Sequence, residues 1–574
     1  MVIDYKGVTF SFKEQKRKQF LRKIRIFIII VALIGLYLII RNSLDAGKIK
    51  TIQELMLANK GAEASEKLKA IEGSFFHKGT KKELEALLLL AAGNRGSSAN
   101  ARAILESLGS SNSLINYQKF LDYFSDRAQY RELKIYTTYL LKVRRAPETS
   151  LSFYKAMYNT AMADFKGSIT AMGQMSAADK EKHKQELAII AKTNNDMKTG
   201  RVNYIFDVNG KPLAYYDLPK KKTISETPGM FFDTIDSQGD ISENLRFFSF
   251  TLDRDIQEKI HYLFKKGNLH GSFLLINLND GSIAAAYSNS LTDDGKREEI
   301  VGNSVFSQYY EPGSIIKLIT LFAYLQSGGQ GIFTLECDGS LPLKDNIFYD
   351  WIKHKLVKNY EEALMISCNI CFARMGLYTG EEKLISVLKA FYFNNRNGGL
   401  KDRFFTFNTG TFTPEITNKY QLANLSVGLN EIAATTFHAA LIPAIIAQNG
   451  TFNSPYLIKN EKNLLNLAYY NHPAQLLTVV NDTAVFSKIK EAMIRVVEDK
   501  RGTGRRAKVD FVRVAIKTGT AGNRALGLDA IMSGFFPTEK PQYAFGFRLQ
   551  GVGQCEYKGA LFLKDFLTSF YGRK

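Results

Sequence analysis

The most constraining feature of this chain is an uncharged apolar run close to its start. Residues Ile26–Ile40 contain no charged side chain, and an arginine stands at each end of the run, Arg25 and Arg41. The run is slightly shorter than the about 20 residues that usually span a bilayer. Arginine side chains can snorkel to the interface, however, which extends the usable stretch to Ile24. The sequence therefore predicts a transmembrane anchor over residues 26–41.

Charge around this run predicts its orientation. Residues 1–25 carry eight lysines and arginines against two acidic residues. Because such a segment stays in the cytoplasm, we expect a basic cytoplasmic tail over residues 1–25, a single pass through the cytoplasmic membrane, and everything after residue 41 outside. A cleaved signal peptide and a buried core helix are the alternatives. Residues Asn42–Lys48 contain no small-x-small cleavage pattern, which favours the uncleaved anchor.

Composition limits the class of protein. The 574 residues include 45% apolar and 23% charged residues, which indicates a globular protein of several domains. Four cysteines exclude a disulfide-dense scaffold, and the seven histidines form no Cys/His cluster at zinc-ligand spacing. The net charge is +20, yet Lys220–Lys222 has no aromatic platform or Gly-rich phosphate loop beside it. We therefore expect a solvated basic surface, or one that faces anionic lipid, and no nucleic-acid partner.

Residues 42–198 are predicted to form a helical domain, because their apolar residues recur at helical spacing. Leu90–Gly93 and Thr160–Ala163 begin two similar segments at an offset of about two 34-residue units, which leaves helical-hairpin repeats open. An irregular helical domain is the preferred interpretation. The period changes near residue 199, and residues 199–245 are predicted as a short linker that begins with a strand, a turn and a second strand.

Residues 246–574 have a mixed α/β pattern to the end of the chain. Predicted strands lie at both ends of this region and helices fill its middle, which indicates an antiparallel sheet assembled from both ends around an inserted helical part. A hairpin is predicted at Asn279–Gly281. The predicted strands are Gly271–Leu278, Gly281–Tyr287, Phe511–Ile516, Ala530–Phe536 and Tyr543–Leu549.

Three short motifs in this region could carry chemistry: Ser314-Ile-Ile-Lys317, Ser367-Cys-Asn369 and Lys517-Thr-Gly519. Each pattern also occurs elsewhere in the chain, so a motif alone is a weak signal. The other copies are Ser152–Lys155, Ser487–Lys490, Ser98–Asn100, Ser110–Asn112, Ser242–Asn244 and Lys198–Gly200. The local context of each copy has to decide between them.

Context favours the first set. Ser314 follows a Pro-Gly pair and opens an apolar helix over Ile315–Leu325, so Lys317 lies on the same face of that helix. Burial in such a helix lowers the pKa of the Lys317 amine, which makes it a usable base for the Ser314 hydroxyl. Lys517–Gly519 ends the predicted strand and is followed by Thr520, a combination that suits a bound carboxylate. Gly519 lets a ligand lie against the strand edge.

With these motifs, the region from residue 246 to the end resembles the penicillin-binding transpeptidases. Segments at Thr251–Gln257, Asn279–Ala285 and Gly502–Ala507 are similar to the family's opening helix, first hairpin and lead-in to the Lys-Thr-Gly strand. Gly200–Ala214 is similar to the entry of the pedestal in its class B, monofunctional members. The resemblance implies the α/β (α+β) penicillin-binding transpeptidase and serine β-lactamase-like fold, an antiparallel sheet flanked by helices with an all-helical subdomain.

The resemblance also implies catalytic roles. Ser314 would be the acylated nucleophile and Lys317 its base. Ser367 would relay a proton to the leaving amine, Asn369 would hold the substrate amide, and Lys517 would tune the electrostatics of the site. No metal and no cofactor is implied.

Substrate binding is implied for the rest of the third motif. Thr518, Gly519 and Thr520 would hold the terminal carboxylate of a D-Ala-D-Ala stem together with Lys517. The backbone N–H groups of Ser314 and Thr520 would form the oxyanion hole. Two departures from the family are Ile315, where threonine is frequent, and a pedestal that is shortened or replaced.

The function that the resemblance implies is a membrane-anchored peptidoglycan D,D-transpeptidase, which cross-links stem peptides through a serine acyl-enzyme and is inhibited by β-lactams. Its substrates would be a D-Ala-D-Ala donor and an amine acceptor. A D,D-carboxypeptidase or β-lactamase on the same scaffold is one alternative, and a non-catalytic β-lactam sensor or scaffold is another. The anchor and the helical domain suggest a membrane glycosyltransferase of the cell-wall machinery as a partner.

Two other groups of residues invite a functional interpretation. Cys368 and Cys371 form a Cys-x-x-Cys pair, for which packing is favoured over a redox or metal role. A disulfide that also involves Cys337 or Cys555 stays open. Asp207 and Asp253 are predicted to stabilise a turn and a helix start rather than to act as catalytic carboxylates.

Overall fold

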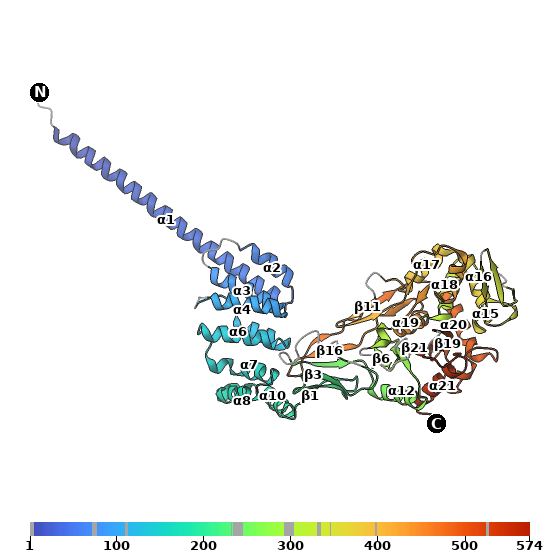
Figure 1. The fold of residues 1–574 in the computed structure, drawn as a ribbon. Helices are drawn as coiled ribbons and strands as arrows, with labels where there is room; N and C mark the ends of the chain where they lie inside the picture. The colour runs from blue at the N-terminus through green and yellow to red at the C-terminus, as the bar shows by residue number, and fades with distance from the viewer. Residues whose placement is uncertain are drawn as a thin grey trace. The chain divides into compact units, whose positions relative to one another are not determined.

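A computed structural model of the chain divides into two compact units (Figure 1). The first consists of residues 1–194 with 243–245 and 463–467, and the second of residues 195–242, 246–462 and 468–574. The structure describes residues 5–71, 77–109, 113–230, 232, 245–291, 303–329, 334–344, 346–395, 399–523 and 527–573. Outside these ranges lie residues 1–4 of the predicted tail, most of 231–244 of the predicted linker, and the motif copies 110–112 and 242–244.

The first unit begins with one continuous helix, α1 (Tyr5–Leu57), which contains the predicted anchor. Its stretch Lys16–Leu57 is the one helix of the described residues that is long and apolar enough to cross a membrane, with a best-window mean hydropathy of 2.6 and none of that window buried. The predicted boundary between residues 41 and 42 therefore lies inside a helix. No proline interrupts this stretch, so the backbone hydrogen bonds continue past the apolar run.

Successive helical hairpins form the rest of the first unit. Helix α3 packs on α4, α5 on α6, and α7 on α8. The bounds are α2 (Gly61–Lys69), α3 (Lys78–Ala91), α4 (Arg95–Ser107), α5 (Tyr117–Asp126), α6 (Tyr130–Lys142), α7 (Glu148–Ala161), α8 (Phe165–Gln174), α9 (Ala177–Lys182) and α10 (Lys184–Met197). The fully buried carboxylate of Glu83 on α3 accepts hydrogen bonds from Arg145 at 2.7 Å and from Tyr136 at 2.7 Å, which ties neighbouring hairpins together.

The second unit contains a six-stranded sheet in the order β17-β16-β4-β1-β2-β3. Its strands are β1 (Arg201–Phe206), β2 (Pro212–Asp217), β3 (Lys222–Ser225), β4 (Phe247–Phe250), β16 (Ile458–Lys462) and β17 (Ala468–Asn471). The strand, turn and second strand predicted after residue 199 are confirmed as β1 and β2. Residues 199–245 were expected to form a linker, but they supply three strands of this sheet because β1 pairs in parallel with β4 from the following region.

A five-stranded antiparallel sheet is the centre of the second unit, in the order β19-β20-β21-β5-β6. It consists of β5 (Gly271–Asn277), β6 (Ile283–Ser288), β19 (Ala515–Asn523), β20 (Gly527–Phe536) and β21 (Tyr543–Leu549). The prediction of an antiparallel sheet assembled from both ends of the region is confirmed. Helices α12 (Arg254–Lys266) and α21 (Lys558–Phe570) pack together beside it, and α19 (Thr436–Ala447) packs on β5, β20 and β21.

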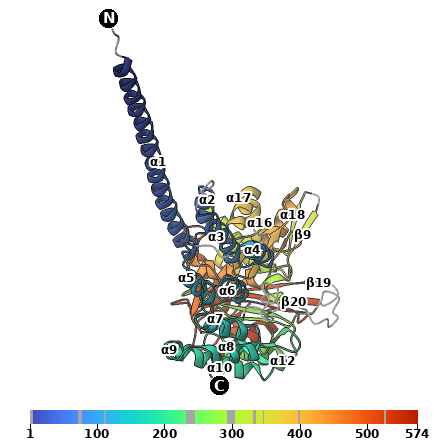
Figure 2. The same ribbon diagram turned by 90° about the vertical axis from the view of Figure 1, so that its left-hand side faces the viewer.

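The predicted strand at Phe511–Ile516 is wrong in its position. Strand β19 starts at Ala515, and the Lys517-Thr-Gly519 motif lies inside the strand instead of after it (Figure 2). The strand begins where pairing with β20 begins, at the Ala515–Phe535 partners. Val512 and Val514 alternate with polar residues because both enter the hydrophobic core, without a strand partner.

The inserted part between β6 and β19 is largely helical, with short two-stranded ribbons. This arrangement agrees with the helical subdomain that the resemblance implies. Its helices are α13 (Ser304–Ser307), α14 (Lys317–Gln326), α15 (Tyr360–Met365), α16 (Asn369–Thr379), α17 (Glu381–Ala390), α18 (Lys419–Val427), α19 and α20 (Thr483–Glu498). Its ribbon strands include β7 (Leu335–Cys337), β8 (Ser340–Leu343), β9 (Asn346–Tyr349), β10 (Lys355–Val357), β11 (Gly399–Asp402) and β12 (Phe405–Asn408).

Candidate active site

The three sequence motifs meet where the helical insertion joins the five-stranded sheet. Ser314 lies in a 3₁₀ turn, η1 (Gly313–Ile316), and Lys317 is the first residue of α14. The expectation that Ser314 opens the α-helix itself is corrected, because the apolar helix starts three residues later. Ser367 and Asn369 flank the N-terminus of α16, and Lys517 lies on the edge strand β19.

Two glycines allow the turn that carries Ser314 to lie against β19. Gly313 has a left-handed φ of 56°, and a Cβ added to it would lie 2.9 Å from the carbonyl oxygen of Thr520. A Cβ on Gly519 would lie 2.9 Å from the carbonyl oxygen of Pro312. Since both approaches are closer than a real Cβ tolerates, glycine at these two positions brings the backbone of Ser314 beside that of Thr520.

Lys317 is completely buried and joins the first motif to the second. Its Nζ donates to the carbonyl oxygen of Ser367 at 2.7 Å, to the Ser367 hydroxyl at 3.3 Å and to Asn369 Oδ1 at 2.6 Å. Burial lowers the pKa of Lys317 to about 8. Within the part of the chain that the structure describes, Lys317 makes no hydrogen bond to Ser314.

Lys517 joins the third motif to the second. Its Nζ donates to the Ser367 hydroxyl at 2.8 Å and to the carbonyl oxygen of Thr518 at 2.8 Å. Burial, followed by repulsion from the neighbouring Lys317 ammonium, holds the pKa of Lys517 well below its ordinary value. The Ser367 hydroxyl oxygen thus accepts hydrogen bonds from two buried lysines, so its own proton is available to a further partner.

These groups surround a cavity of about 240 Å³. Residues from all three motifs line it, namely Ser314, Ser367, Asn369, Thr518 and Thr520. Ser314 is half-buried, whereas both lysines lie beneath the wall with no exposed surface. The cavity is closed on its other sides by Trp351, Val427, Leu429, Thr503, Leu528, Gln554 and Glu556.

Sequence reasoning did not assign Thr503, Gln554 or Glu556 to the site. The hydroxyls of Thr503 and Thr518 are 2.6 Å apart, so the Gly-Thr-Gly segment before β19 orients a hydroxyl of the third motif. That segment was already quoted for its likeness to the family, which is a signal for Thr503. Gln554 and Glu556 follow β21 and have no such signal, because only the fold brings them to the cavity.

The competing motif copies lie elsewhere. Ser152 is buried within α7, where its hydroxyl donates to the carbonyl oxygen of Glu148. Ser98 is buried in α4 and donates to Glu132. Ser487 is exposed on α20, as expected for a solvated position, although it lies inside that helix rather than at its start. Lys198–Gly200 falls between α10 and β1, without a preceding strand.

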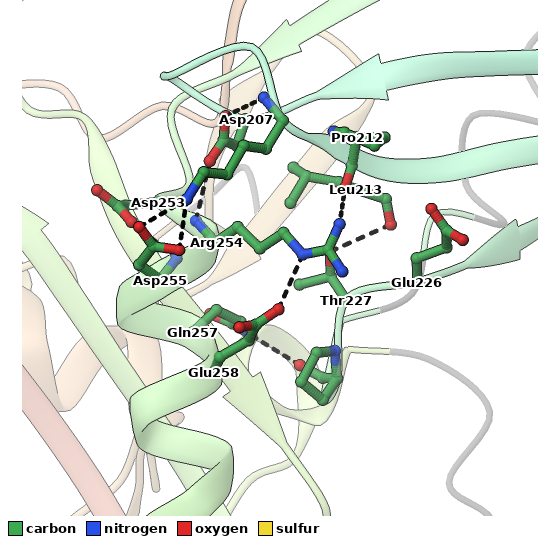
Figure 3. Close-up of polar contacts among 12 residues, drawn as sticks. Asp207, Pro212, Leu213, Glu226, Thr227, Asp253, Arg254, Asp255, Gln257 and Glu258 are labelled. Carbon is green, nitrogen blue, oxygen red and sulfur yellow. Dashed lines mark hydrogen bonds and ion pairs between the residues drawn. The ribbon is translucent and has the colours of Figure 1, made fainter.

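Asp207 and Asp253 have the structural roles predicted for them (Figure 3). Asp207 Oδ1 accepts the backbone N–H groups of Asn209 and Lys211 in the turn between β1 and β2. Asp253 is the N-cap of α12 and accepts the N–H of Ile256 at 3.2 Å. Neither carboxylate lines the cavity described above.

The four cysteines are all buried and free in the structure. Cys368 is the N-cap of α16, and its sulfur accepts the backbone N–H of Cys371 at 3.4 Å. The preferred packing interpretation fits Cys371. Cys368, however, also lies 3.1 Å from a carboxylate oxygen of Asp350, a contact that packing alone does not require.

Comparison with known proteins identifies the family. Residues 271–564, just over half of the chain, match the family described as penicillin binding protein transpeptidase domain. The chain is similar to peptidoglycan D,D-transpeptidase PbpA of Mycolicibacterium smegmatis, at 26% identity over 269 residues, 44% of this chain and 52% of that protein. Peptidoglycan D,D-transpeptidase MrdA of Acinetobacter baumannii is 25% identical over 268 residues, 42% of this chain and 39% of that protein. The chain thus spans about half the length, or less, of these curated relatives.

The fold is also found among solved structures. The penicillin G acyl-enzyme complex of penicillin-binding protein A from Mycobacterium tuberculosis is similar with a TM-score of 0.56 and 19% sequence identity, over 65% of this chain and 99% of that one. Together with the family match, this chain belongs to the penicillin-binding protein transpeptidase family and is class B-like.

Proposed function

We propose that this protein is a membrane-anchored peptidoglycan D,D-transpeptidase whose nucleophile is Ser314. The observation that carries the proposal is the common cavity of the three motifs, in which Ser314, Ser367 and Asn369 face the same space as Thr518 and Thr520. Two buried lysines support the wall of that cavity at one point, the Ser367 hydroxyl. Such a constellation is suited to acyl transfer through a serine ester.

Acylation would begin with the proton of the Ser314 hydroxyl. A neutral Lys317 amine accepts this proton while Ser314 Oγ attacks the carbonyl carbon of the penultimate D-Ala. Because burial lowers the pKa of Lys317 to about 8, a useful fraction of the amine is neutral near physiological pH. The oxyanion that forms would be held by the backbone N–H groups of Ser314 and Thr520, each donor contributing about 3–4 kcal/mol to the transition state.

The second motif would handle the leaving group. The Ser367 hydroxyl accepts from both lysines and passes its own proton to the departing D-Ala amine, after which it is reprotonated from the lysine side. Asn369 would hold the substrate amide, since Lys317 already fixes its carbonyl oxygen. Lys517, Thr518 and Thr520 would bind the terminal carboxylate beside Gly519. An amine from a second stem peptide then attacks the ester and forms the cross-link.

A β-lactam would enter the same cycle at its first step. Attack of Ser314 on the ring carbonyl opens the lactam and leaves an acyl-enzyme with no small leaving group to depart. The structural likeness to a penicillin G acyl-enzyme complex supports a fold able to hold such an adduct. The site residues need neither a metal nor a cofactor in this scheme.

The N-terminal part would place the enzyme at its substrate. We propose that residues 26–41 anchor the chain in the cytoplasmic membrane, with residues 1–25 in the cytoplasm and residues 246–574 outside as the transpeptidase domain. The exposed apolar surface of α1 supports an anchor, because Phe27 is 67% exposed and Ile39 is 67% exposed. Residues 42–198 would be the domain that binds a membrane glycosyltransferase, and residues 199–245 the pedestal.

A labelling experiment tests this proposal. The detergent-solubilised chain, Ser314→Ala and the matched control Ser487→Ala are incubated with a fluorescent penicillin, and the covalent adduct is measured after denaturation. We expect a long-lived adduct on the wild type and on Ser487→Ala, and none on Ser314→Ala. A wild type that stays unlabelled while the drug remains intact would contradict the proposal. Rapid hydrolysis of the drug would instead favour the β-lactamase alternative.

A further inference from the structure

A second cluster of reactive side chains lies directly behind the second motif. Cys337 ends β7, Asp350 follows β9, His354 precedes β10, and Cys368 stands between Ser367 and Asn369. One ligand atom from each of the first four lies within 4.8 Å of all the others. Both cysteines are fully buried, and the side chains of Asp350 and His354 are 0% and 4% exposed.

The individual separations have the size of the edges of a metal-centred tetrahedron. Asp350 Oδ2 lies 3.5 Å from Cys337 Sγ, 3.1 Å from Cys368 Sγ and 3.3 Å from His354 Nδ1. Cys337 Sγ lies 3.7 Å from His354 Nδ1. Ligand bonds of ~2.0–2.3 Å to a tetrahedral zinc ion place neighbouring ligand atoms roughly 3.3–3.8 Å apart. The observed distances match this range to within about 0.2 Å.

We propose that Cys337, Asp350, His354 and Cys368 bind one Zn²⁺ ion. Two thiolates, an imidazole and a carboxylate form a set that suits zinc better than calcium or magnesium, which prefer oxygen ligands alone. Four protein ligands in a buried cluster are typical of a structural site rather than a catalytic one. Binding would release the thiol protons of both cysteines to solvent and leave sulfur–zinc bonds in their place.

The sequence spacing concealed this site. Zinc ligands were sought as close Cys/His pairs, whereas these four residues come from three separate turns of the chain between Cys337 and Cys368. The only close cysteine pair misleads, because Cys371 points away from the cluster as a packing residue and Cys368 contributes alone. The short ribbon of β7 and β10 is what brings Cys337 beside His354, through the pairing of Cys337 with Lys355.

The position of the ion would make it a positioning group for the candidate active site. Cys368 is held between Ser367, which both lysines contact, and Asn369, which Lys317 contacts. Asp350 Oδ2 also accepts the backbone N–H of Ile370 at 3.2 Å in the first turn of α16. An ion that holds Cys368 and Asp350 therefore fixes the backbone that presents the second motif. This role rests on the proposed function, whereas metal binding itself does not.

Metal content measured on the full chain tests the proposal. The wild type, purified in detergent without an affinity tag that binds metal, is expected to contain about one zinc per chain by inductively coupled plasma mass spectrometry. Cys337→Ala and His354→Ala should lose the zinc, whereas the matched cysteine controls Cys371→Ala and Cys555→Ala should keep it. Cobalt added to the chelator-treated wild type should produce the visible absorption of tetrahedral thiolate coordination, which supports the site even where a variant fails to fold.

A second readout separates the metal from the chemistry. Removal of zinc should slow labelling by fluorescent penicillin at least about tenfold, and added zinc should restore it. Bound zinc in a protein that penicillin never labels would support the metal site and contradict the proposed function. A folded wild type that binds neither zinc nor cobalt would overturn the site and leave Asp350 and His354 as a buried ion pair beside two neutral thiols.

Discussion

Lys317 and Lys517 donate hydrogen bonds to the same atom, the hydroxyl oxygen of Ser367, at 3.3 and 2.8 Å. Both lysines are fully buried, and each ammonium raises the free-energy cost of charging the other. The site therefore favours a state in which at least one amine is neutral. This shared partner links the nucleophile's base, the proton relay and the carboxylate-binding strand in one network.

The rate of acylation should depend on pH through Lys317. Its pKa is lowered to about 8 by burial, and only the neutral amine can accept the Ser314 proton. We expect the second-order rate constant for labelling by fluorescent penicillin to rise about tenfold per pH unit below pH 8 and to level off above it. Stopped-time labelling between pH 6 and 10 measures this.

Lys490→Met is the matched control for that profile. Lys490 is also partly buried and has a lowered pKa, but it binds Asn449 and lies outside the cavity. Its removal should leave the pH profile unchanged. A wild-type rate that does not vary with pH would rule out a neutral Lys317 as the base.

Lys317 should also affect stability with a definite sign. Its pKa is about 8 in the folded chain and 10.5 in its ordinary state, so between these values the unfolded chain binds more protons. The free energy of unfolding of the wild type, relative to Lys317→Met, should therefore rise with pH across this window, by about 1–3 kcal/mol. Urea unfolding of both proteins at pH 7.5 and pH 10 measures the difference, and a fall with pH would contradict the assignment.

Gly519→Ala should impair acylation without unfolding the chain. The added Cβ would meet the carbonyl oxygen of Pro312 at 2.9 Å and push η1 away from β19. A displacement of the nucleophile by a fraction of an ångström should slow penicillin labelling by about 10–100-fold. Gly173→Ala, where an added Cβ meets nothing within 4 Å, is the control. Equal labelling rates for the two variants would show that the close approach does not matter.

Thr503→Val should slow labelling while the variant stays folded. The substitution keeps the shape of the side chain but removes the hydroxyl that lies 2.6 Å from that of Thr518. Because Thr518 then loses its orienting partner, we expect a tenfold lower rate, about 1.4 kcal/mol in the barrier. The exposed Thr568→Val on α21 is the control. Wild-type kinetics for Thr503→Val would remove Thr503 from the site.

The helical unit should depend on one buried ion pair. Glu83→Ala leaves Arg145 and Tyr136 without their carboxylate partner in a fully buried position. We expect the unfolding free energy to fall by about 3–5 kcal/mol. Glu106→Ala, which removes an exposed partner of Arg102, should change it by less than about 1 kcal/mol. Thermal unfolding followed by circular dichroism compares the two, and equal melting temperatures would contradict the prediction.

The sequence by itself determined the local features of this protein. The apolar run around residues 26–40, the helical period of residues 42–198 and the Pro-Gly entry to Ser314 are short-range signals, since each depends on residues within a few turns of one another. The three motifs and their order were sufficient to single out Ser314, Lys317 and Lys517 over the other copies. The structure places these residues around one cavity and its supporting wall.

Only the tertiary structure decided which distant residues share a sheet or a cluster. Pairing with β20 sets the start of β19 at Ala515, and pairing of β1 with β4 turns an expected linker into part of a sheet. The same is true of Cys337 and His354, which meet only because β7 and β10 pair. Strand pairing and side-chain clustering depend on contacts between segments far apart in the chain. No pattern within a short window contains that information.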